Sequence, residues 1–289
     1  MNEPLFRGVC TALVTPFLGD AINYPMVEIL LRRQIDAGIH AVVLSGTTGE
    51  SPALSDSEKL ELFRRAKAYV GNDCKIIAGT GTNNTLHTVR LSRLAQEAGV
   101  DGLLIVSPYY NKGTIESLEK HFCAVSQSVS VPIILYNVPS RTGQDMPVEL
   151  YRRLSKTPNI VGVKEAGTDM TKITRTRITC DLRFSVWSGN DDLTVPVISL
   201  GGSGVISVTS NVAPTEVAAM TNAALDGDFD TAAELQGRLQ ALNDLMFCEV
   251  NPVPVKAAMR CIGYDCGACR LPLGDPTQDT QKKLSAFFG

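Results

Sequence analysis

The feature that most constrains the fold of this chain is an eightfold alternation of short apolar runs with longer segments of helical periodicity. The runs are rich in Val, Ile and Leu and are continuously apolar, as is typical of parallel strands buried on both faces. They lie at residues 8–14, 40–44, 75–78, 102–106, 133–136, 160–163, 184–187 and 204–208. Amphipathic segments between them include 26–37, 57–70, 85–98, 115–126 and 147–154. Eight such units predict a (β/α)8 barrel.

A doubly wound parallel sheet is the alternative fold. Its first strand is usually followed by a glycine-rich nucleotide loop, whereas the first run here continues into Thr15-Pro16-Phe17. Strand signals stop at Pro214, and helical segments then lie at 216–225, 230–246, 253–262 and 280–288. We therefore predict an α/β chain with a (β/α)8 TIM barrel over residues 1–224 and a small C-terminal helical region over residues 225–289.

Charge and hydropathy exclude several classes of protein. The 27 Lys and Arg nearly balance the 30 Asp and Glu, without a basic tract, so neither nucleic acid nor a membrane surface is an expected partner. No run approaches the ~20 apolar residues that a membrane span requires. The first residues, Met1-Asn2-Glu3-Pro4, lack the pattern of a signal peptide, and we expect a cytoplasmic protein.

Eight cysteines are scattered through the chain. Cys261, Cys266 and Cys269 have the C-x4-C-x2-C spacing of some iron–sulfur proteins, but the nearest fourth cysteine, Cys248, lies upstream rather than downstream. In a chain large enough to fold without disulfides, small apolar thiols are the simpler interpretation. We expect no metal and no cluster.

Polar segments follow, or lie in, six of the predicted strands, at the end where (β/α)8 barrels carry their active sites. They are residues 45–50, 107–111, 136–143, 162–166, 188–191 and 204–207. Any one of them could be a turn, but six at the same end of one barrel predict a site.

Lys164 is the most informative residue of these segments, because it ends a strand that is expected to be buried. A buried lysine either pairs with a carboxylate or takes part in chemistry, and a neutral amine can attack a ketone to form a Schiff base. An ion pair with Glu165 is the alternative, although neighbouring residues of a strand point to opposite faces. Tyr136 ends the adjacent strand, where it is either a core aromatic or a phenol that transfers protons.

Two glycine-bearing segments have both a binding and a structural interpretation. Thr47 and Thr48 offer hydroxyls and backbone N–H groups to a carboxylate, or they form a plain turn. Residues 201–204 either cradle a phosphate or, as we expect, form a flexible connection.

Four of the polar segments, 46–50, 107–111, 136–143 and 162–166, resemble the 4-hydroxy-tetrahydrodipicolinate synthase family, also called dihydrodipicolinate synthases. The resemblance runs in order from residue 7 to residue 273 and includes residues 251–256. The lysine, the tyrosine and a Gly-x-Thr-Gly-Glu turn are shared with the wider superfamily of pyruvate-dependent Schiff-base lyases. The Thr47-Thr48 pair and Ser140-Arg141-Thr142 are more specific to the synthases.

The resemblance implies that Lys164 forms an imine with pyruvate, whose carboxylate is held by Thr47 and Thr48. The resulting enamine would attack the aldehyde of L-aspartate 4-semialdehyde. Cyclisation would then give 4-hydroxy-tetrahydrodipicolinate, in the first committed step of lysine and diaminopimelate biosynthesis. No metal, nucleotide or other cofactor is implied.

The resemblance also implies roles for residues of the other segments. Tyr136, Thr47 and Tyr110 would form a proton relay, with Tyr110 supplied by a partner subunit. Arg141 would bind the carboxylate of the semialdehyde. Gly189 and Ile206 would contribute to substrate binding. Members of the family are usually homotetramers, built as a dimer of dimers.

Two alternative functions stay open. A related pyruvate aldolase, acting on N-acetylneuraminate, 2-keto-3-deoxygluconate or 4-hydroxy-2-oxoglutarate, would use the same imine. A catalytically silent small-molecule sensor on the same barrel would be expected to lack the lysine or the tyrosine, and both are present.

Lysine-inhibited members of the family bind their effector at a dimer interface, and the corresponding positions form a candidate effector pocket. It consists of Ser51, Asp56, Lys59, Asn83, His87 and Tyr109. His87 stands where the resemblance implies an acid for the ammonium of the effector, and Lys59 adds a cation. Asp56 could compensate only by reaching that ammonium. We therefore expect weak or absent inhibition by L-lysine.

Overall fold

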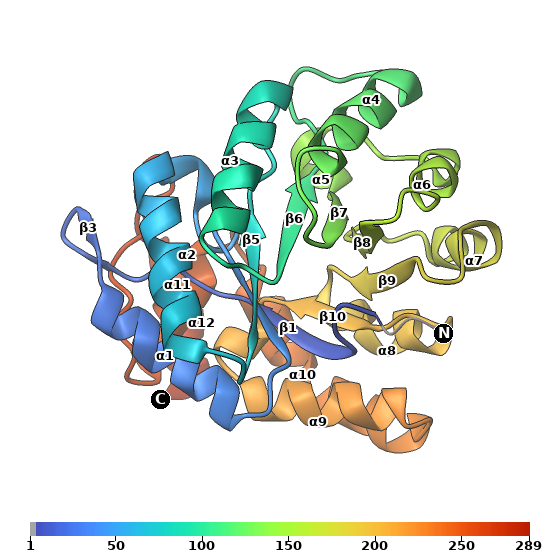
Figure 1. Cartoon of the computed structure of the whole chain (residues 1–289). Helices are drawn as coiled ribbons and strands as arrows, with labels where there is room; N and C mark the ends of the chain where they lie inside the picture. The colour runs from blue at the N-terminus through green and yellow to red at the C-terminus, as the bar shows by residue number, and fades with distance from the viewer. Residues whose placement is uncertain (1–3) are drawn as a thin grey trace.

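Each of the eight apolar runs forms a strand, and the strands pair in parallel around a closed barrel (Figure 1). The computed structural model describes residues 4–289, so Met1, Asn2 and Glu3, on which the signal-peptide expectation partly rests, lie outside the described residues. The strands are β1 (Gly8–Ala12), β4 (Ala41–Leu44), β5 (Lys75–Gly79), β6 (Gly102–Val106), β7 (Ile133–Asn137), β8 (Ile160–Glu165), β9 (Ser185–Ser188) and β10 (Gly204–Ser207). Their order is β1-β10-β9-β8-β7-β6-β5-β4, and β4 pairs with β1. The predicted fold class is confirmed.

The seam between β1 and β10 closes the barrel through two glycines. Gly8 and Gly204 are directly paired. A Cβ at Gly204 would lie 1.9 Å from the carbonyl oxygen of Gly8, and its φ of 135° belongs to a region that L side chains avoid. The first and last strands can therefore approach closely only because this position has no side chain.

Helices follow the strands and form the outer layer of the barrel (Figure 1). They are α1 (Tyr24–Asp36), α2 (Asp56–Val70), α3 (Thr85–Glu97), α4 (Ile115–Ser126), α6 (Val148–Leu154), α7 (Met170–Thr179), α8 (Thr194–Ser199) and α9 (Pro214–Leu225). The start of α2 illustrates how the sequence sets a boundary. Ser55 Oγ accepts a hydrogen bond from Glu58 N at 3.2 Å, and Glu58 Oε2 accepts one from Ser55 N at 2.8 Å, which forms a capping box.

Several short or polar elements have little signal in the sequence. The helix α7 is rich in Thr and Arg, and α5 (Pro139–Thr142) and α8 are shorter than two turns. The strands β2 (Phe17–Leu18) and β3 (Ala21–Ile22) form an antiparallel hairpin that the sequence does not predict. Residues 4–289 also contain three 3-10 helices: η1 (Ser51–Ala53), η2 (Asp191–Leu193) and η3 (Thr209–Asn211).

Two strand boundaries differ from their predictions in a way that affects the site. The prediction of a strand over 8–14 is wrong at its end, because β1 stops at Ala12. The prediction over 160–163 is too short, because β8 continues through Lys164 and Glu165. Polar residues end the predicted run but not the strand, since backbone pairing with β7 and β9 continues to Glu165.

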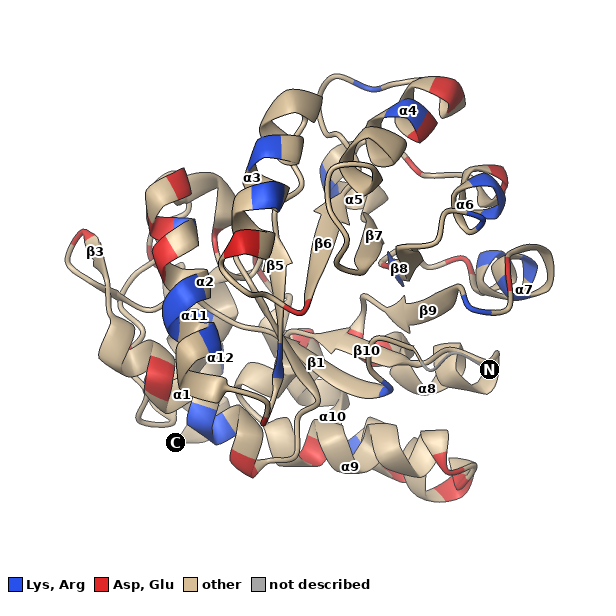
Figure 2. Ribbon diagram, viewed as in Figure 1, with Lys and Arg blue, Asp and Glu red and all other residues tan. Residues whose placement is uncertain are grey.

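Charge is distributed unevenly between the two layers of the barrel. Figure 2 shows both signs interspersed on the outer helices and few charged residues on the strands. Within the eight barrel strands the charged residues are Lys75, Lys164 and Glu165. Lys75 begins β5 and is exposed, whereas Lys164 and Glu165 end β8 and are buried. The buried charged residues of the barrel strands therefore both lie at the end of β8.

Three helices follow the barrel: α10 (Phe229–Met246), α11 (Val253–Cys261) and α12 (Gln278–Phe288). The helix α10 packs on α9 and α8, and α12 packs on α11. The division between residues 224 and 225 stays a prediction, and it falls at the end of α9. Within residues 4–289, none of the helices combines the length and the hydropathy that a bilayer crossing requires.

A buried ion pair connects α11 to the turn that follows β4. Lys256 Nζ lies 2.8 Å from Glu50 Oε1, and both side chains are almost fully buried. The second oxygen of Glu50 accepts a hydrogen bond from the backbone N–H of Arg270 at 2.8 Å. The carboxylate thus holds two parts of the C-terminal region against the mouth of the barrel.

We predict that Lys256→Met lowers the free energy of unfolding by about 3–5 kcal/mol, because it leaves the Glu50 carboxylate buried without its counter-ion. Urea denaturation followed by circular dichroism would measure the change. Arg238→Met is the matched control: it breaks the exposed pair with Glu234 and should cost less than about 1 kcal/mol. Adding Glu50→Gln to Lys256→Met should restore part of the loss. If Lys256→Met and Arg238→Met lowered the free energy of unfolding equally, this role of the ion pair between Lys256 and Glu50 would be contradicted.

Candidate active site

Lys164 and Tyr136 lie side by side inside the barrel. They are paired residues of the adjacent strands β8 and β7, and Lys164 Nζ lies 4.5 Å from the centre of the Tyr136 ring. Lys164 is 5% exposed and Tyr136 is 7% exposed. Tyr136 belongs to the apolar cluster that fills the barrel, together with Trp187 and Ile206. The predicted proximity of the amine and the phenol is therefore confirmed.

An irregularity in β8 produces this alignment. Ile133 pairs with Ile160, but Ile134 pairs with Gly162, so Val161 has no partner of its own in β7. Such a bulge inserts one extra residue into one strand. Without it, Tyr136 would lie opposite Val163 rather than Lys164.

Glu165 does not pair with Lys164. Its carboxylate lies 3.1 Å from Lys172 Nζ and accepts hydrogen bonds from Tyr151 Oη at 2.8 Å and Asn137 Nδ2 at 2.7 Å. Burial and the Glu165 charge raise the pKa of Tyr151, which stays a neutral donor. The ion pair between Lys164 and Glu165 that we considered as an alternative is wrong, and the Lys164 ammonium has no ion pair or hydrogen bond within residues 4–289.

Asp191 is a buried carboxylate near Lys164, and its oxygens accept hydrogen bonds from a hydroxyl and from the backbone. Asp191 accepts hydrogen bonds from the Ser207 hydroxyl and from the N–H of Val208, the latter at 2.9 Å. Burial raises the pKa of Asp191, against the hydrogen bonds and the positive charge of Lys164, which lower it. Asp191 thus holds the end of β10 in place and makes no ion pair with Lys164.

Gly189 and Ile206 lie at the ends of the two strands that follow β8. A Cβ on Gly189 would lie 2.6 Å from the Cβ of Ala166, so the chain packs there without room for a side chain. Ile206 is fully buried inside the barrel. Their predicted contribution to substrate binding stays a prediction.

The Thr47-Thr48 turn is held from the C-terminal region. Thr48 Oγ1 accepts a hydrogen bond from Asn251 Nδ2 at 3.0 Å. Ser45 and Glu50, at the two ends of the turn, have positive φ angles of 55° and 56°, a conformation that costs energy for residues other than glycine. The backbone of the turn is therefore strained at both ends, and carboxylate binding by Thr47 and Thr48 stays a prediction.

Asn251 and Ser107 are polar residues that the sequence analysis assigned no role. Asn251 Oδ1 and Ser107 Oγ are buried and have no hydrogen-bond partner within the described chain. Ser107 follows β6 directly, and its N–H donates to the carbonyl oxygen of Tyr136 at 3.0 Å. Ser107 can be identified from the sequence because it follows a predicted strand at the end that carries the site. Nothing in the sequence around Asn251 indicates its contact with Thr48.

A cavity of about 250 Å³ lies among the predicted site residues. Thr47, Tyr136 and Arg141 line it, so the structure brings these three predicted site residues together. Arg141 is exposed, and its Nη2 donates to the carbonyl oxygen of Asn251 at 3.1 Å. The same cavity is lined by Ser51, Lys59 and Tyr109 of the candidate effector pocket.

Tyr110 does not join this group in the single chain. It is 91% exposed and has a φ of 70°. Its hydroxyl is therefore available to another molecule rather than to Tyr136 of its own chain. Its supply to a partner subunit stays a prediction.

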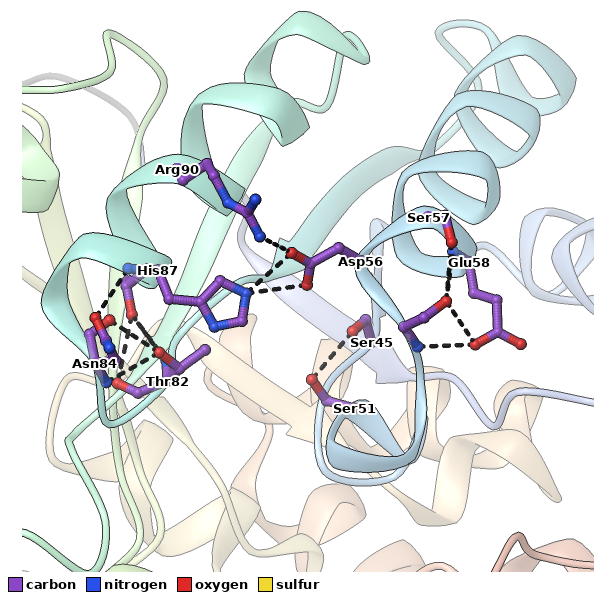
Figure 3. A network of polar contacts seen from close by, with 11 residues as sticks. Ser45, Ser51, Asp56, Ser57, Glu58, Thr82, Asn84, His87 and Arg90 are labelled. Carbon is purple, nitrogen blue, oxygen red and sulfur yellow. Dashed lines mark hydrogen bonds and ion pairs between the residues drawn. The ribbon is translucent and has the colours of Figure 1, made fainter.

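The candidate effector pocket has its own charge network, drawn in Figure 3. His87 Nε2 lies 3.0 Å from Asp56 Oδ1, and Arg90 forms an ion pair with the other oxygen of Asp56. Burial would raise the pKa of Asp56, but the hydrogen bond to His87 and the charges of His87, Arg90 and Lys59 outweigh it and lower the pKa. Asn83 uses its carbonyl oxygen to accept a hydrogen bond from Asn111 at 2.8 Å. Asp56, the acid that could have paired with the ammonium of a lysine effector, is thus already paired with His87 and Arg90.

The three cysteines of the C-x4-C-x2-C segment differ in their exposure to solvent. Cys261 is exposed, and Cys266 and Cys269 are buried. Burial raises the pKa of Cys266 to about 11 and that of Cys269 to about 12, so both remain neutral thiols near pH 7. Among residues 4–289, no three His, Cys, Asp or Glu side chains are grouped to hold a metal ion.

Comparison with known proteins gives consistent matches over nearly the whole chain. Residues 5–288 match the Dihydrodipicolinate synthetase family. A 4-hydroxy-tetrahydrodipicolinate synthase of Thermoanaerobacter sp. (strain X514) is 43% identical over 286 residues, which cover 99% of this chain and 96% of the relative. The crystal structure of dihydrodipicolinate synthase from Aquifex aeolicus has a TM-score of 0.96 at 41% identity, covering 98% of this chain and 97% of that chain. The crystal structure of the enzyme from Cyanidioschyzon merolae with lysine bound has a TM-score of 0.95 at 38% identity, with coverage of 98% and 97%.

Proposed function

Because the chain belongs to the dihydrodipicolinate synthetase family, we propose that it condenses pyruvate with L-aspartate 4-semialdehyde to give 4-hydroxy-tetrahydrodipicolinate. One observation carries the proposal: Lys164 is buried at the end of β8, without a counter-ion, 4.5 Å from the ring of Tyr136. A lysine that only stabilised the fold would be paired, as Lys172 and Lys256 are.

The reaction begins at the Lys164 amine. Nζ adds to the C2 carbonyl carbon of pyruvate, and loss of water leaves an imine. Loss of a methyl proton turns the imine into an enamine, whose carbon attacks the aldehyde carbon of the semialdehyde. The amino group of the semialdehyde then attacks the imine carbon, which closes the ring and releases Nζ.

Proton transfers in these steps are assigned to Tyr136, Thr47 and Tyr110. Tyr136 is adjacent to Nζ, and Thr47 lines the cavity that Tyr136 also lines. A positioned hydroxyl contributes about 10²–10⁴-fold to a rate through general acid–base catalysis. Tyr110 is the member that the single chain leaves exposed, which supports its donation to a second subunit.

Binding of the two carboxylates is assigned to different residues. Thr48, whose hydroxyl is oriented by Asn251, and the N–H groups of its turn would hold pyruvate. Arg141 would hold the carboxylate of the semialdehyde, through a guanidinium that lines the cavity. Gly189 and Ile206 are assigned to the wall of the substrate site.

The assembly and the location are also part of the proposal. We assign a homotetramer, built as a dimer of dimers in which Tyr110 crosses one interface. We assign a cytoplasmic location, and the division of the chain into a catalytic barrel at 1–224 and a helical region at 225–289.

We predict that borohydride together with pyruvate adds one reduced pyruvate per chain at Lys164, because borohydride traps an imine. Mass spectrometry of proteolytic peptides would locate the adduct. Lys164→Ala should remain folded and lose most turnover. An active preparation that shows no adduct, or an adduct on another lysine, would refute the mechanism.

Aldehyde specificity separates the synthase from the aldolases that share its imine. A coupled assay with pyruvate and each candidate aldehyde should give turnover with L-aspartate 4-semialdehyde and much less with N-acetylmannosamine, glyceraldehyde or glyoxylate. Imine trapping combined with preference for another aldehyde would assign the chain to a related aldolase.

Tyr110→Phe is predicted to reduce turnover by about 10²–10⁴-fold, because one hydroxyl of the relay is lost. Mixing Tyr110→Phe with Lys164→Ala should restore partial activity, since a mixed dimer would contain one site with both groups. Subunit exchange is verified with differently tagged chains. Verified exchange without recovered activity would place Tyr110 outside a cross-subunit relay.

We predict weak or absent inhibition by L-lysine, because Asp56 is engaged by His87 and Arg90 while Lys59 would repel an ammonium. Steady-state assays at neutral pH would measure the inhibition constant. His87→Glu supplies a carboxylate and should increase sensitivity. An inhibition constant at or below the millimolar range for the unmodified chain would show this interpretation of the pocket to be wrong.

A further inference from the structure

Four buried lysines of the described chain divide into two kinds. They are Lys59, Lys164, Lys172 and Lys256. Lys172 and Lys256 pair with buried carboxylates, whereas the side-chain ammonium groups of Lys59 and Lys164 have no ion pair or hydrogen bond to any residue of 4–289. A buried ammonium without a partner is energetically costly. Lys164 is explained by its proposed chemistry, and Lys59 has no explanation in the reaction.

The carboxylates closest to Lys59 along α2 are engaged elsewhere. Asp56 pairs with His87 and Arg90. Glu58 lies 2.6 Å from Arg270 and also closes the capping box of the helix. Lys59 lies in the first turns of α2, where the helix dipole adds positive potential. The surroundings of Lys59 therefore have an unmet preference for negative charge.

The cavity beside Lys59 is suited to an anion. Lys59 and Arg141 line it, and no Asp or Glu of the described chain does. The wall of the same cavity also offers hydroxyls, among them those of Ser51 and Tyr109, and apolar surface from Pro52. A lysine ammonium beside hydroxyls and apolar surface is suited to a carboxylate that carries a short carbon chain. An amino acid would bring its own ammonium toward Lys59.

We propose that this cavity binds a small monocarboxylate, with its carboxylate paired to Lys59 Nζ and its carbon chain against Pro52 and Tyr109. This is the candidate effector pocket with a ligand of the opposite charge. The inference goes beyond the proposed function, because it requires neither the imine nor the semialdehyde.

Calorimetric titration with butyrate tests this proposal, and Lys164→Ala protein is used so that imine chemistry cannot contribute. We expect one butyrate per chain with millimolar affinity, and no binding of butylamine, which has the same length and the opposite charge. Adding Lys59→Met should weaken binding at least tenfold, and Lys59→Arg should largely preserve it. Lys120→Met, which removes a surface charge on α4, is the matched control and should leave binding unchanged.

Three outcomes would overturn the proposal. The first is butyrate affinity that is unaffected by Lys59→Met. The second is loss of binding in Arg141→Met but not in Lys59→Met, which would place the anion at Arg141 instead of Lys59. The third is absence of binding in the assembled protein, which would mean that a partner subunit supplies the carboxylate. Circular dichroism confirms folding of each variant, and Lys59→Gln replaces any Lys59→Met protein that does not fold. Since the titration uses Lys164→Ala protein without substrate, failure of this proposal leaves the imine mechanism at Lys164 untouched.

Discussion

The alternation of side chains along β8 is the constraint on which the site depends. Consecutive strand residues point to opposite faces, so Lys164 and Glu165 cannot share one environment. Lys164 enters the barrel beside Tyr136 without a counter-ion, and Glu165 leaves it to bind Tyr151 and pair with Lys172. The bulge at Val161 sets the phase of this alternation relative to β7. A shift by one residue would exchange the two environments, since the side-chain period of a strand is two.

Much of the fold and the centre of the site could be predicted, because both depend on local patterns that the barrel then gathers. The apolar runs identify the strands since parallel strands are buried on both faces. Barrel topology places all strand ends at one face, so Lys164, Tyr136 and Thr47 could be grouped before any distance was known. The opposite orientation of Lys164 and Glu165 followed from strand geometry alone.

The remainder depends on contacts between distant parts of the chain or on weak local signals. Asn251 meets Thr48 across 203 residues, and no periodicity reports such a contact. The engagement of Asp56 by His87 and Arg90 depends on how α2 packs beside α3. The hairpin of β2 and β3 has two residues in each strand, which is too short for a pattern.

The ion pair between Glu50 and Lys256 has a consequence for how such barrels can be recombined. It ties the Thr47-Thr48 turn to the C-terminal helices, and the hydrogen bond from Asn251 to Thr48 crosses the same boundary. The C-terminal region is therefore a structural component of the barrel mouth rather than an appendage. A chimera that grafts the binding turn from one barrel onto another must transfer residues 45–50 and 251–270 together, because each segment supplies the buried partners of the other.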